Sequence, residues 1–434
     1  MLRYARALLV VVWVIPLLAQ SAGAQTPDRV DGTRLNETMM AMRDFGGTPE
    51  GGSTRVAYSQ HNKNALEYLA ELMRDAGLET HIDFAGNLIG RKSGSETGLK
   101  PLVSGSHVDT VPNGGHYDGV VGTMSAIEVA RTLNDAGYEL RHPLEIVAWS
   151  NEEGGKTGSR AWNGSVLPME LSLPSLGDKR LGDGMRFLGG DPKRLAEVVR
   201  PDNSLAAYVE LHVEQGAFLD ADGISIGVVE GIVGIKRWNV TVEGFANHAG
   251  TTPMDQRQDA LYAAAQIVTV IRDVIVEEPG TQVGTVGRLR ASPGAPNVIP
   301  GEAVFSLEIR DLSMAKIDRL FARIDERANR ISDANSVDVT FTQFYESPAA
   351  ITDERISAAV SKSAEALDLS FVSMPSGAGH DAQSLAALGP LGMIFVPSFD
   401  GVSHAPSEFT SPEAITDGAN VLLRTLLELD RTLP

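Results

Sequence analysis

Short apolar runs that end in polar, glycine-rich turns recur along the first half of the chain and constrain the fold most strongly. Residues 101–106 and 143–150 are two such runs, each as long as a buried strand. Between them, residues 120–133 have the pattern of a helix, and residues 207–213 resemble a further strand. Strands that alternate with helices predict an α/β domain built on a central sheet.

A second region follows a different order, from about residue 236 to residue 348. Its predicted elements are a strand at 236–242, a helix at 259–276, strands at 284–290 and 303–310, a helix at 315–331 and a strand at 337–341. The order β-α-β-β-α-β is typical of a ferredoxin-like α+β sandwich. We therefore expect an inserted lid domain at 236–348, within a discontinuous catalytic domain formed by residues 25–235 and 349–434.

The first 24 residues have the features of an export signal. Arg3 and Arg6 give a positive start, residues 7–19 are apolar, and small residues stand at 22–24, so that cleavage is expected after Ala24. The apolar stretch has 13 residues, fewer than the roughly 20 that a membrane-spanning helix needs. We expect a periplasmic or secreted protein without a membrane segment after cleavage, and an uncleaved anchor is the alternative.

The charge balance and the lack of cysteine narrow the chemistry. Asp and Glu total 56 against 37 Lys and Arg, which gives a net charge of −19 and argues against nucleic acid or an anionic membrane as a partner. Because there is no cysteine, disulfides and a thiol nucleophile are excluded, and no thiolate is available to bind a metal.

Candidate metal ligands follow the predicted strands, at the sheet edge where α/β domains bind their ligands. They lie in short glycine-flanked runs: His107 and Asp118 in GSHVDTVPNGGHYDGVVG, Glu152 and Glu153 in NEEGG, His212 in ELHVEQG and His404 in SHAPSE. Two metals that share a carboxylate can activate a water molecule near neutral pH. The set predicts a metal-dependent amide hydrolase.

Each of these residues has a plainer interpretation when it is taken alone. Asp118 precedes a predicted helix and could be an N-cap. Glu152 and Glu153 could be a solvated acidic turn, although adjacent carboxylates repel unless a cation compensates them. His212 could be a core histidine, and His404 is equally ambiguous. Their joint occurrence favours the metal site.

The run His107-Val108-Asp109 predicts how one ligand is oriented. Side chains alternate along a strand, so that His107 and Asp109 would share a face. Asp109 is then expected to accept the second imidazole proton of His107 and to fix its tautomer.

Three residues of the inserted region suit a substrate better than a metal: His248 in NHAG, Asn297 in PNVIP and Arg310 in LEIRD. A histidine can donate to the oxyanion that forms at an amide carbonyl. An arginine can hold a carboxylate with two hydrogen bonds. For Arg310, a salt bridge with Asp311 or Glu308 is the alternative.

The motifs occur in the same order in a known group of enzymes. Together with NHAGTTPM, PNVIPG and SGAGHDA, they make the chain resemble the N-carbamoyl-L-amino-acid hydrolases, allantoate amidohydrolases and β-ureidopropionases of the aminoacylase-like (M20) metallopeptidase clan. The resemblance runs from about Gly46 to Leu429. It implies a zinc-peptidase-like catalytic domain with a central mixed sheet, two divalent ions per subunit (zinc or manganese, with cobalt or nickel as alternatives) and a homodimer formed through the lid domains.

The resemblance also implies roles for the motif residues. His107 and His212 would hold one metal, Glu153 and His404 the other, Asp118 would bridge them, and Glu152 would be the general base. The substrate-binding residues would be Gln215, His248, Asn297, Arg310, Gly379 and His380, with those of the lid coming from the partner subunit. One motif departs from the group, because this chain has NEEGGKTGSRAW where the related enzymes read NEEGSRF.

The leading hypothesis is hydrolysis of the ureido amide bond of an N-carbamoyl amino acid or an allantoate-like compound that carries a free carboxylate. An N-acyl amino-acid amidohydrolase or dipeptidase with the same metals is the alternative enzyme. A binding protein that keeps the fold and the metals without turnover is the alternative from another class, and the presence of Glu152 argues against it.

Overall fold

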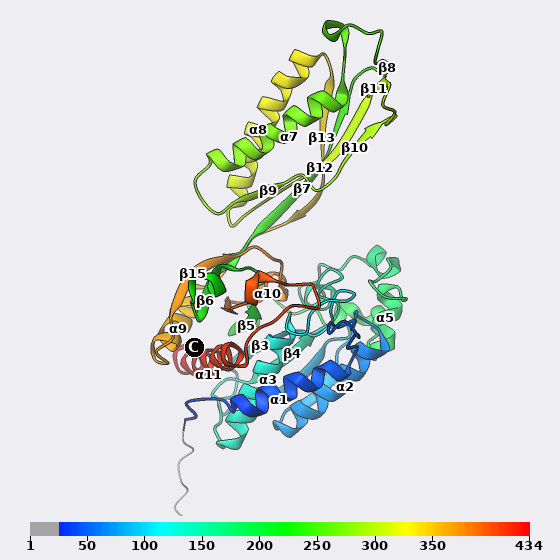
Figure 1. Ribbon diagram of the computed structural model, residues 1–434. Coiled ribbons are helices and arrows are strands. Elements are labelled where there is room, and N and C mark those ends of the chain that lie inside the picture. Colours follow the sequence, from blue (N-terminus) through cyan, green and yellow to red (C-terminus); the bar gives the residue numbers. More distant parts are fainter. Residues whose placement is uncertain (1–25) are drawn as a thin grey trace, which may run out of the picture.

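The computed structural model describes residues 26–434, which form a broad lower body and an elongated second body that stands away from it (Figure 1). The predicted export signal lies outside the described residues. Within residues 26–434, none of the helices combines the length and the apolar character that crossing a membrane requires.

The lower body is built on a mixed sheet whose strands follow the order β1-β2-β4-β3-β5-β16-β6-β14, with β15 paired to β6. The strands are β1 (Glu79–Ile82), β2 (Leu88–Lys92), β3 (Leu102–His107), β4 (Leu144–Trp149), β5 (Ala207–Val213), β6 (Ile226–Ile232), β14 (Ala350–Ile351), β15 (Phe371–Ser376) and β16 (Leu391–Val396). β3 is parallel to β4 and β5, whereas β2 and β6 run antiparallel to β4 and β16. The predicted α/β class with a central mixed sheet is confirmed.

Helices cover both faces of this sheet. They are α1 (Gly32–Ala41), α2 (Gln60–Asp75), α3 (Val120–Asp135), α4 (Thr157–Trp162), α5 (Leu181–Leu188), α6 (Phe218–Asp222), α9 (Glu354–Glu365), α10 (Asp381–Leu385) and α11 (Pro412–Thr432), with short 3-10 turns η1 (Met42–Asp44), η2 (Pro168–Ser172), η3 (Pro192–Glu197) and η5 (Phe399–Gly401). Successive residues of β4 alternate between two apolar clusters: Ile146 and Ala148 pack with α1, α2, α3 and α11, and Val147 and Trp149 pack on the opposite face.

The elongated body has its own sheet, in the order β10-β12-β7-β13, with β9 also paired to β12. Its elements are β7 (Gly234–Glu243), α7 (Ala260–Glu277), β9 (Val283–Thr285), β10 (Leu289–Ser292), β12 (Glu302–Asp311), α8 (Met314–Asn335) and β13 (Asp338–Ser347). The two helices cover one face of the sheet and bury a separate apolar core, in which Trp238 stacks on Phe321 with ring centroids 4.4 Å apart. β8 (Asn247–His248), the 3-10 turn η4 (Met254–Gln256) and β11 (Val298–Ile299) belong to the far tip.

The predicted single strand at 284–290 is wrong, because the chain forms two short strands there. β9 pairs with the Glu308–Arg310 end of β12, and β10 pairs with the Glu302–Phe305 end. Gly284 and Gly287 lie in this stretch, and glycine weakens a strand because it adds backbone entropy and no side-chain packing.

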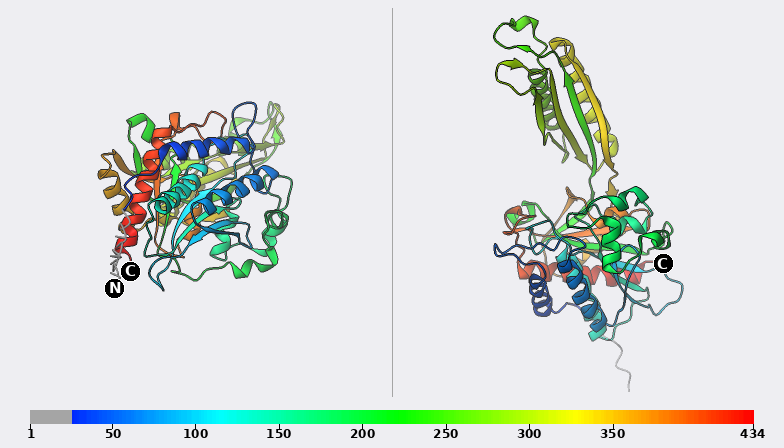
Figure 2. Two further views of the ribbon diagram at one scale, coloured as in Figure 1. Left: turned by 90° about the horizontal axis from the view of Figure 1, so that it is seen from below. Right: turned by 90° about the vertical axis from the view of Figure 1, so that its right-hand side faces the viewer.

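The two connections between the bodies lie side by side. Ser347 at the end of β13 pairs with Ile235 at the start of β7, so both crossings occur at one place (Figure 2). The elongated body is therefore attached to the lower body at one end, and its tip projects away.

Candidate metal centre

Neighbouring parallel strands bring His107 and His212 together. His107 ends β3, His212 lies one residue before the end of β5, and their ring centroids are 5.8 Å apart. Nδ1–H of His107 donates to the backbone carbonyl of Asp109 at 2.9 Å, and Nδ1–H of His212 donates to that of Val213 at 2.9 Å. These bonds fix the tautomers, so both rings turn a free Nε2 toward the same space.

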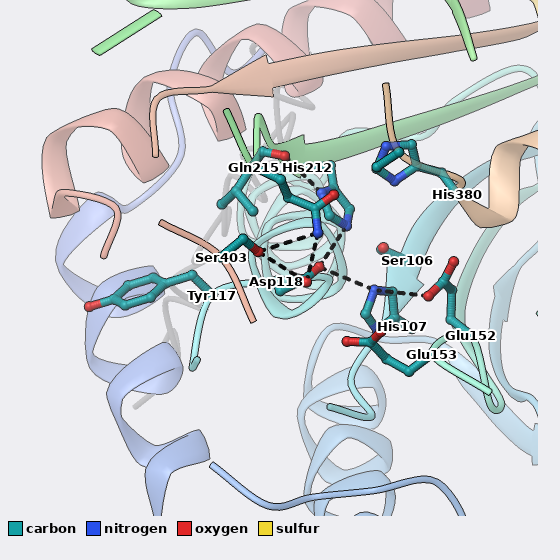
Figure 3. A network of polar contacts seen from close by, with 12 residues as sticks. Ser106, His107, Tyr117, Asp118, Glu152, Glu153, His212, Gln215, His380 and Ser403 are labelled. Atoms are coloured by element: carbon teal, nitrogen blue, oxygen red, sulfur yellow. Dashed lines mark hydrogen bonds and ion pairs between the residues drawn. The ribbon is translucent and has the colours of Figure 1, made fainter. Parts of the chain in front are cut away.

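The carboxylate of Asp118 lies at the centre of the ligand set (Figure 3). Its Oδ1 is 3.5 Å from Nε2 of His107 and 3.2 Å from Nε2 of His212. Its Oδ2 is 3.0 Å from Nε2 of His404, and that nitrogen is 3.6 Å from Oε1 of Glu153. Each oxygen of Asp118 therefore faces a different group of ligands.

The donor set fits divalent ions. Two groups of three, His107–Asp118–His212 and Asp118–Glu153–His404, have ligand atoms close enough to share one ion each. Ligands held tetrahedrally at about 2.0–2.2 Å from zinc lie roughly 3.3–3.6 Å from one another, and the distances around Asp118 run from 3.0 to 3.6 Å. Nε2 of His212 is buried and has no hydrogen-bond partner within residues 26–434, which an ion would supply.

A glycine allows Asp118 to approach the histidines. Gly119, not Asp118, is the N-cap of α3, so the plain N-cap interpretation of Asp118 is wrong. Gly119 has φ +66°, and a Cβ there would lie 2.4 Å from Nε2 of His107. Any side chain at this position would therefore displace the ligand or the start of the helix.

Glu408, which the sequence analysis did not single out, holds the Asp118 segment in place. Its Oε1 accepts the backbone N–H groups of Tyr117 at 2.8 Å and Asp118 at 2.9 Å, and its Oε2 accepts the hydroxyl of Ser403 at 3.0 Å. The side-chain amide of Gln215 donates to Oδ2 of Asp118 at 2.8 Å. The signal for Glu408 was present, since it is the acidic residue that closes the SHAPSE motif.

The predicted contact of Asp109 is wrong. Its carboxylate is 4.0 Å from Nδ1 of His107, which bonds to the backbone carbonyl instead. Because β3 ends at His107, the alternation of side chains does not continue to Asp109. The carboxylate accepts the backbone N–H groups of Glu152 and Glu153, both at 3.3 Å, and so fixes the acidic turn.

The carboxyl groups of Glu152 and Glu153 keep their protons to a higher pH than exposed carboxyl groups do. Burial raises the pKa of Glu152 to about 7 and that of Glu153 to about 8, and the Asp118 charge adds to both. The hydrogen bond to Asp118 raises the pKa of His404 to about 9. The cluster is therefore not the solvated acidic turn of the alternative interpretation, and a cation would relieve the repulsion within it.

The structure brings several predicted substrate residues to the same place. Gln215, Arg310, Gly379 and His380 line one cavity of about 200 Å³ together with Glu152 and the candidate metal ligands. The His380 ring packs against His212 at 4.4 Å between centroids, and its Nε2 is 2.8 Å from Oγ of Ser376.

Arg310 reaches this cavity within its own chain, so the expectation that it comes from a partner subunit is wrong. It lies near the end of β12 that adjoins the lower body. Its Nε donates to Oε1 of Glu308 at 2.7 Å, and its Nη1 donates to the carbonyl of Gly377 at 2.7 Å. The salt bridge considered as the alternative is present, and it orients the guanidinium without removing it from the cavity.

His248 and Asn297 are not brought to the cavity of their own chain. His248 lies in β8 and pairs with Val298 of β11, and the backbone N–H of Ala249 donates to the carbonyl of Asn297 at 3.0 Å. This ribbon lies at the tip of the elongated body, far from the strand ends that carry the metal ligands (Figure 1).

Two buried carboxyl groups beneath the cavity were also missed. Glu210 accepts the hydroxyl of Ser106 at 2.7 Å and the backbone N–H of Ala382 at 3.0 Å, and it forms a further candidate metal group with His212 and His380. Asp381 is fully buried, and its oxygens have no hydrogen-bond partner among the described residues. Burial and the neighbouring Glu152 raise its pKa well above the ordinary range.

Comparison with known proteins places this geometry among enzymes. The profile of Peptidase family M20/M25/M40 matches residues 103–428. The N-carbamoyl-L-amino acid amidohydrolase of Geobacillus stearothermophilus is 40% identical over 405 residues, which cover 92% of this chain and 99% of that protein. The allantoate amidohydrolase of Escherichia coli (strain K12) is 33% identical over 402 residues, 91% and 97% of the two chains. A solved amidase of the hydantoinase/carbamoylase family from Burkholderia multivorans matches with a TM-score of 0.85 and 34% identity, over 94% of this chain and 100% of that one.

Proposed function

The chain belongs to the peptidase family M20/M25/M40, as its motifs predicted, and we propose that it hydrolyses the ureido amide bond of an N-carbamoyl amino acid or an allantoate-like compound. One observation carries this proposal. The carboxylate of Glu152, the guanidinium of Arg310 and the two candidate ligand groups around Asp118 line the same cavity. Similarity to N-carbamoyl-amino-acid and allantoate amidohydrolases over nearly their full lengths supports the substrate class.

Divalent cations held by the two groups around Asp118 would polarise the ureido carbonyl and lower the pKa of a water molecule. Glu152 is the residue that accepts the proton of this water. It belongs to neither ligand group, and its Oε2 lies 3.9 Å from Nε2 of His107. Burial raises its pKa to about 7 in the metal-free protein, and the carboxyl that accepts the proton of the water can pass it to the leaving nitrogen.

Arg310 binds the free carboxylate of the substrate. Glu308 and the carbonyl of Gly377 hold its guanidinium over the cavity, and none of the described residues forms a hydrogen bond with its Nη2. Gln215 and Gly379 complete the cavity walls, and His380 contributes its ring edge. A substrate whose carboxylate and ureido group are separated by one carbon would place them at Arg310 and at the ligand groups respectively.

The proposal extends to the assembly, the ions and the location. The elongated body serves as lid and dimerisation domain, so that His248 and Asn297 of the partner subunit complete the site. Their exposed ribbon at a free tip supports this arrangement. Zinc or manganese, with cobalt or nickel as alternatives, suits the imidazole and carboxylate donors. The charged and apolar N-terminal residues support export to the periplasm or the medium.

The test is turnover by metal-loaded protein, measured as both ammonia and free amino groups. We expect ammonia and an amino acid from N-carbamoyl-L-amino acids, or ammonia from allantoate, with Mn²⁺ or Zn²⁺ added. Release of amino acids from N-acetyl amino acids or dipeptides alone would establish the alternative enzyme. Binding of these compounds without any turnover would establish the binding protein.

A further inference from the structure

A lysine that forms no salt bridge among residues 26–434 stands beside the metal cavity, with Glu152 as a charged neighbour. Lys156 follows the acidic turn and is the N-cap of α4, within the run NEEGGKTGSRAW. Its Nζ donates to Oε1 of Gln383 at 2.5 Å, and within residues 26–434 it forms no ion pair with a carboxylate. By contrast, Arg160 in α4 donates to both carboxylate oxygens of Glu170, at 2.8 Å each.

The backbone of Lys156 is also unusual. Its φ is +57°, a left-handed conformation that a residue with a side chain adopts only where its surroundings hold it. The side chain is half-buried, and among the described residues its hydrogen-bond acceptor is a neutral amide. A partly desolvated cation of this kind gains more from a bound anion than an ammonium already paired on the surface would.

The Lys156–Gln383 pair lies at the boundary between two cavities. A Cβ at Gly379, which lines the metal cavity, would be 3.4 Å from Nζ of Lys156 and 3.7 Å from Oε1 of Gln383. On its other side, the pair lines an outer cavity of about 520 Å³. Gln383 also donates to the carbonyl of Pro348 at 2.7 Å, which anchors the boundary to a connection between the two bodies.

The metal cavity is small for a substrate that carries a long side chain. The metal cavity has about 200 Å³, below the roughly 300–1,000 Å³ typical of small-molecule sites, and it must hold a ureido group and a carboxylate. A longer substrate needs further room, and the neighbouring space beyond Gly379 is the outer cavity. Such a side chain would pass the ammonium of Lys156.

We propose that Lys156 binds a second anionic group of the substrate, so that the enzyme prefers N-carbamoyl amino acids whose side chain ends in a carboxylate. This inference rests on the proposed function and specifies its substrate class. Arg310 would take the α-carboxylate and Lys156 the side-chain carboxylate, while the ureido group faces Glu152.

The experiment compares two nearly isosteric substrates, N-carbamoyl-L-glutamate and N-carbamoyl-L-glutamine, with metal-loaded wild type, Lys156→Met and Lys156→Arg. We expect wild type to favour the glutamate compound in kcat/KM, and Lys156→Met to lose about tenfold or more on it, as for other contacts of a bound charge pair. On the glutamine compound the change should stay within about twofold, and Lys156→Arg should keep part of the preference because it keeps the charge. Lys193→Met, an equal change of charge on an exposed residue, should alter neither substrate.

The possible failures are distinguishable. If wild type hydrolyses both compounds equally well, or if Lys156→Met loses the same factor on both with its metal content intact, the assignment of Lys156 is wrong while the proposed function stands. In the second case the lysine acts on the acidic turn itself, whose Glu152 has a pKa that the Lys156 charge lowers in part. If wild type hydrolyses allantoate but no N-carbamoyl amino acid, the assignment of Lys156 is overturned and the proposed function stands. If it hydrolyses neither allantoate nor any N-carbamoyl amino acid, both proposals are overturned.

Discussion

At the scale of single residues, the carboxylates of Asp118 and Glu152 differ in the side chains that surround them. Both oxygens of Asp118 face imidazole nitrogens, at 3.0–3.5 Å, so this side chain is suited to two ions at once. The carboxylate of Glu152 is further from the imidazoles, with Oε2 3.9 Å from Nε2 of His107, and it belongs to neither ligand group around Asp118. This difference is the basis for the proposal that Asp118 holds ions and Glu152 moves the proton.

Glu152→Gln should abolish turnover while metal content stays at about two ions per chain, since the amide keeps the shape but cannot accept a proton. Asp118→Ala should lose metal as well as activity, because it removes the shared ligand. Elemental analysis and turnover of both variants decide the matter. If Glu152→Gln loses an ion and stays partly active, Glu152 is the metal ligand and Glu153 the general base, the reverse of the proposal.

Metal loading should release protons near neutral pH. Below a group's pKa the proton is bound, so at pH 7 the metal-free protein holds protons on Glu153, with a pKa of about 8, and on His404, with a pKa of about 9. Ions bind the deprotonated forms, and apparent affinity should rise with pH up to about 9. Asp118, whose pKa is held well below its usual range, contributes no proton.

Calorimetry at pH 7 in two buffers of different ionisation enthalpy measures this release. We expect about two or more protons per chain, because the pKa values of the ligands His107 and His212 are raised as well. The protons are shared across a coupled cluster and are not assigned to one residue. Heats that do not depend on the buffer would contradict the protonation state of the site. Glu50→Gln, which changes an exposed carboxylate, should leave the proton count unchanged.

The sequence predicted the candidate metal ligands better than the residues that hold those ligands in position. His107, Asp118, His212 and His404 stand in motifs that can be recognised along the chain, and β3 and β5 carry the first and third of them to one edge of the sheet. The contact of Glu408 with the backbone of Asp118 joins residues 290 positions apart, which no local pattern encodes. The path of the chain after a strand ends is equally hidden, and for that reason the contact of Asp109 was predicted wrongly.

Among the elements, the start of α3 is the part on which the site depends most closely. Gly119→Ala should cost at least one ion per chain, because the added Cβ would lie 2.4 Å from Nε2 of His107. Gly137→Ala, just past the other end of α3, is the matched control: it has φ +60° and nothing within 4 Å of its Cβ position. Both variants bear the left-handed strain of roughly 1–2 kcal/mol, so only the difference in metal content reports the contact. Retention of all metal by Gly119→Ala would show that the helix start can shift freely.

Buried helices and strands were predicted from the sequence more accurately than exposed ones. The helix predicted at 120–133 is α3, Val120–Asp135, and the strand predicted at 207–213 is β5, Ala207–Val213, because both are buried and have clear apolar patterns. The strand predicted at 284–290 failed because β9 and β10 are mostly exposed strands along β12, where glycines interrupt the pattern. Weak burial leaves little sequence signal for the exact course of such a segment.

At the scale of the whole molecule, the elongated body is the part that we propose joins two subunits. Its tip carries His248 away from the cavity of its own chain. If the partner supplies this residue, the inactive variants His248→Ala and Glu152→Gln should complement each other when they are mixed. A mixed dimer has one site with both lesions and one site with none, so random re-association should restore about a quarter of wild-type activity. No recovery, with subunit exchange verified by mass spectrometry, would show that His248 does not act in the partner's site.

The central claim is that Asp118 lies between two ions in one hydrolytic cavity. Anomalous diffraction at the zinc absorption edge from crystals of the zinc-loaded protein tests it most directly. We expect two peaks on either side of the Asp118 carboxylate, roughly 3.5–4 Å apart, one beside His107 and His212 and the other beside Glu153 and His404. A single peak there, or a peak at Glu210, His212 and His380 in its place, would contradict the account.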